Sequence, residues 1–107
     1  MTSFTLTDLA ARVKERAGAS AETSYTRKLL DKGVSHCAKK LGEEAVETAL
    51  AAVAEDRDRV IAEAADLLYH LLVVLEARGV MLAEVEAALA ARVGMSGLEE
   101  KAARPRA

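Results

Sequence analysis

The sequence predicts an all-α fold, an antiparallel bundle of helices, from three observations on its composition and spacing. Ala, Leu and Val dominate the hydrophobic residues, which make up 51% of the chain, whereas aromatic residues make up only 3%. The single proline, Pro105, stands near the end of the sequence, where it interrupts no helix. Apolar residues recur with the period of a helix that buries one face. With 107 residues, the chain has room for one hydrophobic core.

A first helix is predicted over Leu6–Ala17, where the apolar residues share one face. Thr5 and Asp8 have the spacing of a capping box, which would fix the start of this helix. The small and polar residues of Gly18–Ser24 predict a loop, and loops of this kind often close over a ligand. A short helix over Tyr25–Lys32 follows, and a glycine ends it.

Two long helices are predicted over Val34–Glu55 and Asp58–Arg78, because both segments lack proline and are rich in good helix formers. A further helix is predicted over Leu82–Val93, which carries apolar residues on one face. The links around Asp56 and Gly79 are short, and short links make successive helices antiparallel neighbours. The predicted architecture is therefore a bundle.

We expect a single domain over residues 1–94 and a polar, loosely ordered tail over residues 95–107. The formal net charge of −2, with mixed signs and no basic stripe, argues against a nucleic-acid partner. Acidic residues interrupt the apolar segments, which argues against a membrane span. Cys37 is the only cysteine and the N-terminal residues lack a secretory pattern, so we expect a cytoplasmic protein.

The second long helix carries the strongest indication of chemistry. At about 100° per residue, four of its polar side chains fall on one narrow strip, namely Arg59, Glu63, Asp66 and His70. Almost every other residue of this helix is apolar, so protein should surround it on most sides and its carboxylates should face inward or into a cleft. A buried carboxylate without a partner is costly, so these acids need protons, cationic partners or a metal ion.

The preceding helix adds more acids than cations. Glu44 and Glu47 lie about 60° apart around its axis, and Lys40 lies between them one turn earlier. In an antiparallel contact with Glu63 and Asp66, they would assemble four carboxylates, which predicts a cation site. Ligands that are all oxygen favour hard ions such as Mg²⁺ over Zn²⁺. Since Mg²⁺ keeps open positions for phosphate oxygens, the cluster indicates a phosphoanhydride substrate, such as a nucleoside triphosphate.

The neighbouring polar residues each have two interpretations. Glu43 is either a solvated helix acid or an outer carboxylate that activates water. Lys40 is either a surface charge or a phosphate contact beside the metal. His70 is either a core histidine with one hydrogen bond, or a proton carrier or hydrogen-bond donor to phosphate. Cys37 lies on an apolar helix face, which favours a packed thiol over a nucleophile.

The two acid pairs, Glu44-x-x-Glu47 and Glu63-x-x-Asp66, resemble the metal signature of the all-α nucleotide pyrophosphohydrolases. The residues around them are more specific and resemble the phosphoribosyl-ATP pyrophosphohydrolase family, from about residue 24 to residue 93. The segments that carry the resemblance are Ser24-Tyr25-Thr26, Lys40-Leu-Gly42-Glu43-Glu44-Ala-Val-Glu47 and Glu63-Ala-Ala-Asp66-Leu-Leu-Tyr69-His70.

The resemblance implies Mg²⁺-dependent hydrolysis of phosphoribosyl-ATP to phosphoribosyl-AMP and pyrophosphate, the second step of histidine biosynthesis. It also implies a homodimer whose subunits combine their helices in one bundle. A partner subunit would cover the apolar residues that lie around most of the second long helix. The metal ligands that it implies are Glu44, Glu47, Glu63 and Asp66. The catalytic carboxylates that it implies are Glu43, Glu44 and Glu47, and the substrate contacts are Lys40, Ser24, Tyr25, Thr26 and His70.

Three other interpretations compete with this one. The first is a house-cleaning pyrophosphohydrolase that acts on deoxynucleoside triphosphates with the same metal site. The second is a carboxylate-bridged di-iron bundle, but neither long helix has the Glu-x-x-His pair that such a site requires. The third is a helical interaction module without catalysis, in which the acids are solvated and Mg²⁺ has no effect.

Overall fold

The structure, a computed structural model, describes residues 3–93, 97, 101, 102 and 104. Within this part of the chain there are no strands, which confirms the predicted all-α class. The delimited helices are α1 (Leu6–Ala17), α2 (Tyr25–Asp31), α3 (Val34–Ala54), α4 (Arg57–Ala77) and α5 (Leu82–Ala90). None of the described helices combines the length and the apolar character that a membrane crossing requires.

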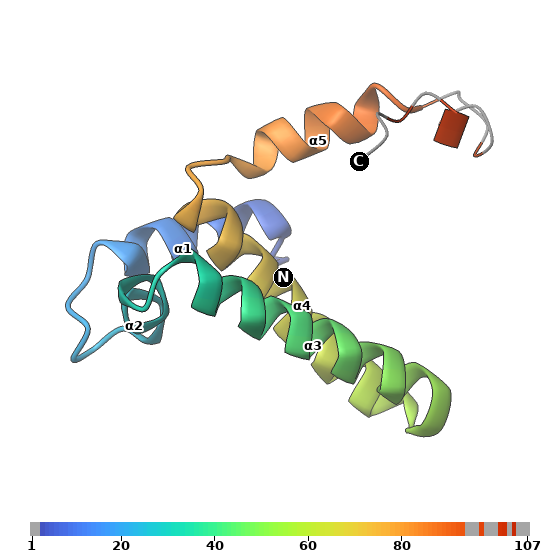
Figure 1. Cartoon of the computed structure of the whole chain (residues 1–107), viewed down its shortest axis with the longest axis horizontal. Coiled ribbons are helices and arrows are strands. Elements are labelled where there is room, and N and C mark those ends of the chain that lie inside the picture. Colours follow the sequence, from blue (N-terminus) through green and yellow to red (C-terminus); the bar gives the residue numbers. More distant parts are fainter. Residues whose placement is uncertain (1–2, 94–96, 98–100, 103, 105–107) are drawn as a thin grey trace.

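Helices α3 and α4 form a long antiparallel hairpin that makes the most extensive helix contact in the structure (Figure 1). Only Glu55 and Asp56 connect them, as the short link predicted. The Asp56 carboxylate accepts a hydrogen bond of 2.9 Å from the backbone N–H of Arg59, which caps the start of α4. Ala51 of α3 is fully buried, and its small side chain lets the two helices approach closely.

Helices α1 and α2 pack against one end of this hairpin and close the hydrophobic core there (Figure 1). One side chain from each of α1, α2 and α3 and two from α4 form the buried cluster, which consists of Val13, Leu29, Cys37, Leu72 and Val73. The Cys37 thiol donates a hydrogen bond of 3.2 Å to the carbonyl oxygen of Leu29. The prediction of a packed thiol at Cys37 is therefore confirmed.

The helix ends follow from local sequence. The predicted capping box is present, because the N–H of Thr5 donates to Asp8 Oδ2 at 2.9 Å and the N–H of Asp8 donates to Thr5 Oγ1 at 3.2 Å. Between α2 and α3, Gly33 has a φ of 95°, and after α4, Gly79 has a φ of 68°. Both turns use the left-handed region, which side chains disfavour, so glycine is the residue that fits there.

Helix α5 begins where it was predicted but ends at Ala90, three residues before the predicted end at Val93. The N–H of Val93 bonds to the carbonyl of Ala90, three residues back, so the chain tightens into a turn. Figure 1 shows α5 extending away from the hairpin, and Leu82 in its first turn is the residue that packs against the core. Its last turn therefore lacks tertiary support. The predicted tail lies mostly outside the described residues.

A row of apolar side chains on the hairpin remains exposed in the single chain. On α3 this row comprises Val46, Leu50 and Val53, and on α4 it includes Ile61 and Leu68. Val53, in the last turn of α3, is 88% exposed. The sequence predicted that protein surrounds α4 on most sides. Within a single chain this is not the case.

Candidate metal and substrate site

Three carboxylates come together between α3 and α4. One carboxylate oxygen from each of Glu44, Glu63 and Asp66 lies within 4.8 Å of the others. Glu44 comes from α3, and the other two residues lie one turn apart on α4. The antiparallel hairpin therefore joins the acids of the two helices as the helical spacing predicted.

Two of these acids are withdrawn from water. Glu63 is 5% exposed, and the side chain of Glu44 is 13% exposed. The Oε2 atoms of both residues are buried and have no hydrogen-bond partner among the described residues. Buried polar atoms almost always have a hydrogen-bond partner. Two buried carboxylate oxygens without one, in the same acid cluster, are suited to bind a cation. The residues present thus fit a divalent metal ion.

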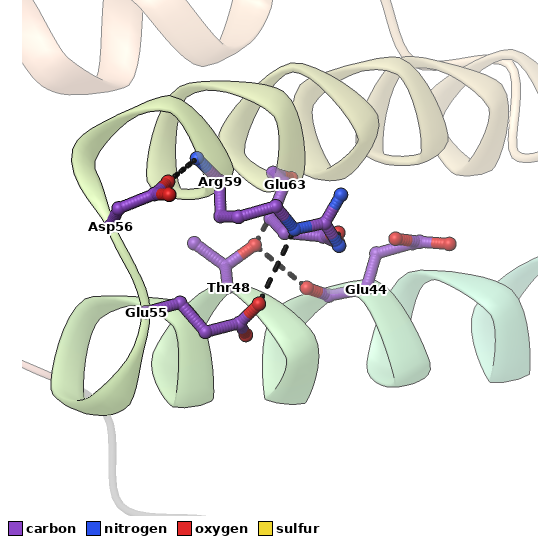
Figure 2. Close-up of polar contacts among 6 residues, drawn as sticks. All are labelled: Glu44, Thr48, Glu55, Asp56, Arg59 and Glu63. Carbon is purple, nitrogen blue, oxygen red and sulfur yellow. Dashed lines mark hydrogen bonds and ion pairs between the residues drawn. The ribbon is translucent and has the colours of Figure 1, made fainter.

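Protein cations balance only part of this charge. Arg59 donates from Nη2 to Glu63 Oε1 at 2.5 Å and from Nε to Glu55 Oε1 at 3.3 Å (Figure 2). The guanidinium therefore contacts one oxygen of Glu63 and leaves the other free. Arg59 was placed on the acidic strip by its spacing, but no role followed from the sequence.

Burial and mutual repulsion make the acids harder to ionise. Burial is the main reason that the pKa of Glu44 is raised, and the charges of Glu47 and Asp66 raise it further. The pKa of Glu63 is also raised, again mainly by burial, although the Arg59 charge acts in the opposite direction. A cation at the cluster would relieve both effects.

Glu47, the fourth predicted ligand, is exposed and lies outside the group of three whose oxygens meet. Its carboxylate is nevertheless close enough to raise the pKa values of Glu44 and Glu63, in each case after the larger effect of burial. The metal role predicted for Glu47 stays a prediction.

Lys40 and Glu43 form an ion pair of 3.6 Å on α3, and Glu43 directly precedes Glu44 of the acid cluster. The Glu43 side chain is 48% exposed, so water reaches it freely. Lys40 is half-buried, and its charge, after burial, lowers the pKa of His70. The lysine thus acts on the same side of the hairpin as the cluster.

His70 is buried beside the cluster. Its Nε2 lies 3.9 Å from Glu44 Oε1, whereas its Nδ1 is buried without a hydrogen-bond partner among the described residues. Burial and then Lys40 lower its pKa, which favours a neutral ring at neutral pH. The ring also meets Tyr69 edge-on, with centroids 5.1 Å apart. The ring is buried as in a core histidine but lacks the expected hydrogen bond, and the substrate contact predicted for His70 stays a prediction.

In the Ser24-Tyr25-Thr26 segment, two residues are buried and one is exposed. Ser24 is buried, and its hydroxyl donates to the carbonyl of Arg16 at 2.8 Å and accepts from the N–H of Arg27 at 3.1 Å. Thr26 is buried as well, and its hydroxyl lies 2.6 Å from the Tyr69 hydroxyl. These hydroxyls are engaged within the protein, so the predicted substrate contacts at Ser24 and Thr26 stay predictions.

Tyr25, by contrast, is 55% exposed. Its ring lies nearly parallel to that of Tyr69, at 19°, with centroids 6.4 Å apart, and it meets His70 edge-on at 6.5 Å. An exposed aromatic face therefore adjoins the histidine that adjoins the acid cluster. Of the three residues in this segment, Tyr25 is the one whose side chain is exposed, and its substrate contact stays a prediction.

Fold and site together define an all-helical protein with a candidate divalent-metal site between two antiparallel helices, as in the all-α nucleotide pyrophosphohydrolases that the sequence resembles. Comparison with known proteins narrows this class. The family phosphoribosyl-ATP pyrophosphohydrolase matches residues 6–93. The chain belongs to this family, and it is a hydrolase.

Individual relatives agree with the family match. The chain is 66% identical over 104 residues to a protein of Bradyrhizobium diazoefficiens named phosphoribosyl-ATP pyrophosphatase 1, and the match covers 97% of this chain and 98% of the relative. A Rhodopseudomonas palustris protein of the same name is 64% identical over 106 residues, which cover 99% of both chains. The phosphoribosyl-ATP pyrophosphatase of Agrobacterium fabrum is 55% identical over 105 residues, which cover 98% of both.

Proposed function

We propose that this chain hydrolyses phosphoribosyl-ATP to phosphoribosyl-AMP and pyrophosphate, in histidine biosynthesis, and that it requires Mg²⁺. Family membership supports the substrate, since the relatives carry the name phosphoribosyl-ATP pyrophosphatase. The observation that carries the metal requirement is the pair of buried oxygens, Oε2 of Glu44 and Oε2 of Glu63, that lack a partner within the three-acid cluster. Oxygen ligands of this kind suit Mg²⁺.

In this proposal Glu44, Glu63 and Asp66 hold the metal ion, and Glu47 completes the set from one turn further along α3. A bound Mg²⁺ would supply neutralisation of the charge on the phosphate oxygens and on the departing pyrophosphate. The catalytic carboxylates are thus the same residues on α3, Glu44 and Glu47, with Glu43 beside them.

Glu43 is the carboxylate that we assign to the attacking water. It is exposed and lies outside the three-acid group, so it is free to accept a proton from water. Lys40, its ion-pair partner at 3.6 Å, would turn from Glu43 to a phosphate oxygen when the substrate binds. The pair thereby supplies a proton acceptor and a phosphate donor from adjacent turns of one helix.

The aromatic residues would receive the nucleoside part of the substrate. The exposed ring of Tyr25 offers a face on which a purine can stack, and such stacking needs no particular base edge. His70 lies between this ring and the acid cluster, 3.9 Å from Glu44. We place the base over Tyr25 and the phosphates toward Glu44, with Ser24 and Thr26 supporting the segment from within.

We further propose that two chains form a homodimer. The exposed row on the hairpin places Val46, Leu50 and Val53 along one face of α3, at a spacing that a partner helix could cover. This row is separate from an apolar groove of about 300 Å³ between α1, the end of α4 and α5, whose lining does not include the three-acid cluster. Light scattering tests the proposal: Leu50→Lys should convert a dimer into a monomer, whereas a monomeric unmodified chain would overturn it.

The function is tested by measuring pyrophosphate release from phosphoribosyl-ATP with and without Mg²⁺, beside a panel of nucleoside and deoxynucleoside triphosphates. We expect release that requires Mg²⁺ and is confined to phosphoribosyl-ATP. Glu63→Gln should reduce the rate by more than about 100-fold while the circular dichroism spectrum stays helical. Glu86→Gln on α5, which removes an exposed carboxylate far along the chain, is the matched control and should change little.

Each other outcome has a definite meaning. Cleavage of deoxynucleoside triphosphates alone would favour the house-cleaning alternative and would overturn the proposed substrate but not the metal site. Full activity in the presence of a chelator would overturn the metal requirement. Absence of any cleavage, with unchanged thermal melting in Mg²⁺, would favour a helical interaction module instead.

A further inference from the structure

The side chain of Thr48 joins the two helices at the level of the acid cluster. Its hydroxyl oxygen lies 2.7 Å from the carbonyl oxygen of Glu44, one turn earlier on α3, and 3.1 Å from the carbonyl oxygen of Glu63 on α4 (Figure 2). A hydroxyl has one proton, which the two carbonyls share in a three-centre hydrogen bond. The residue is partly buried in the contact between the helices.

The two carbonyls belong to the two residues whose carboxylates are buried in the cluster. Each of these backbone oxygens is already placed to accept the ordinary hydrogen bond of its own helix. The Thr48 bond is therefore an additional link, and it connects the backbone of Glu44 directly to the backbone of Glu63.

The link matters because a metal ion requires its ligands at fixed separations. Mg²⁺ accepts oxygens at about 2.0–2.1 Å in near-octahedral geometry, so a slide of one helix along the other would spoil the set. Packing at Ala51, one turn further along α3, brings the two helices close together. The Thr48 hydrogen bond adds a directional contact that opposes a slide of one helix along the other.

We infer that Thr48 is a positioning residue for the metal site: its hydroxyl sets the relative position of Glu44 and Glu63. This inference rests on the proposed metal role of the cluster. It extends that role because Thr48 touches neither metal nor substrate and acts through the backbones of the ligands. Residues that orient metal ligands affect metal affinity about 10- to 100-fold, and we expect the lower end of that range for a backbone link.

The test is Mn²⁺ binding by electron paramagnetic resonance or calorimetry, with the free metal as probe and no substrate. Thr48→Val keeps the shape of the side chain and removes the hydroxyl, and it should weaken Mn²⁺ binding about tenfold. Thr48→Ser restores the hydroxyl and should restore binding to within about twofold. Thr48→Ala, a good helix former, provides a second hydroxyl-free variant in case the valine variant folds poorly. Glu63→Gln should abolish binding.

Thermal melting without metal separates positioning from general destabilisation. We expect the metal-free midpoints of the valine and serine variants to be similar, while their shifts on addition of Mn²⁺ differ. Two outcomes would overturn the inference and leave the metal site in place. The first is wild-type Mn²⁺ affinity in folded Thr48→Val or Thr48→Ala, and the second is a failure of Thr48→Ser to restore binding. Absence of Mn²⁺ binding to the unmodified chain would instead overturn the proposed metal site, and the inference with it.

Discussion

Arg59 contacts one oxygen of the Glu63 carboxylate and leaves the other free. Its Nη2 donates to Oε1 at 2.5 Å, while Oε2 is buried without a partner, and the carboxylate belongs to a cluster that contains Glu44 and Asp66. Within the part of the chain that the structure describes, Arg59 is the cation in direct contact with this cluster's most buried acid. The arrangement partly neutralises Glu63 before any metal binds.

Replacement of Arg59 should therefore make the protein more dependent on metal. Arg59→Met removes the charge that lowers the pKa of Glu63, so the metal-free protein should melt at a lower temperature. Addition of Mg²⁺ or Mn²⁺ should raise the midpoint by more than it does in the unmodified chain, because the metal then replaces a missing cation. Differential scanning fluorimetry at several metal concentrations measures both effects.

The matched control is Arg57→Met, which removes the same charge from the exposed first position of α4. This variant should show the metal-induced shift of the unmodified protein. Equal metal-induced shifts in Arg57→Met and Arg59→Met would show that only overall charge matters and would contradict the specific pairing with Glu63.

The acid cluster should make the folded, metal-free protein less stable as the pH rises. The pKa values of Glu44 and Glu63 are raised above their ordinary value of 4.5, so the folded state holds protons that the unfolded state has released. The contribution of these two groups is fully present below the unfolded pKa and is lost as pH rises through the raised folded pKa. Relative to a Glu44→Gln/Glu63→Gln variant, the unmodified metal-free protein should lose stability as pH rises above about 4.5.

Chemical denaturation at a series of pH values in the presence of a chelator measures this difference. Saturating Mn²⁺ should remove it, because metal competes with protons for the same oxygens. A stability difference that stays constant from pH 4 to pH 8 would contradict the raised pKa values.

Tyr25 should contribute to substrate affinity rather than to folding. The ring is 55% exposed, so Tyr25→Ala should leave the thermal midpoint nearly unchanged. Loss of a stacking surface for the base should raise KM for phosphoribosyl-ATP about tenfold, with a small change in kcat, since stacking binds substrate and transition state alike. Tyr25→Phe keeps the stacking face and should retain the wild-type KM. A KM that is insensitive to Tyr25→Ala would place the base elsewhere.

Cys37 should be unreactive in the folded protein. The thiol is 1% exposed, and burial raises its pKa, so both access and thiolate formation are suppressed. Ellman's reagent should modify it rapidly in denaturant and only at the rate of unfolding under native conditions. Rapid modification of the native protein would show that the core around Leu29 and Cys37 opens readily.

The sequence was sufficient to predict the elements that local spacing determines. The capping box at Thr5, the glycine turns and the joining of Glu44 with Glu63 and Asp66 follow from helical periodicity and short links, and the structure contains them. The early end of α5 was not predictable, because Ala91 and Arg92 are good helix formers and give no stop signal, whereas in the structure the chain tightens into a turn there.

Side-chain direction at the site was less accessible to sequence reasoning. Ser24 looked like part of a binding segment, but a serine before a helix is also an N-cap, and here its hydroxyl is used inside the protein. The sequence does not single out Thr48, because a single threonine within a helix has no distinctive pattern. Its spacing of four residues from Glu44 was the available signal, since it places both side chains on one face toward α4.

The two-residue link between α3 and α4 has a consequence for how the protein folds. Thr48 lies seven residues before Glu55, and Glu63 lies seven residues after Asp56, so the contact between them spans only 15 residues. Loop closure over such a distance has a small entropic cost, and proteins rich in short-range contacts fold fast. The hairpin can therefore bring its acids together early in folding, before α1 and α2 dock. The repulsion between these acids then raises the barrier to hairpin formation, and divalent ions in the surrounding solution would lower it.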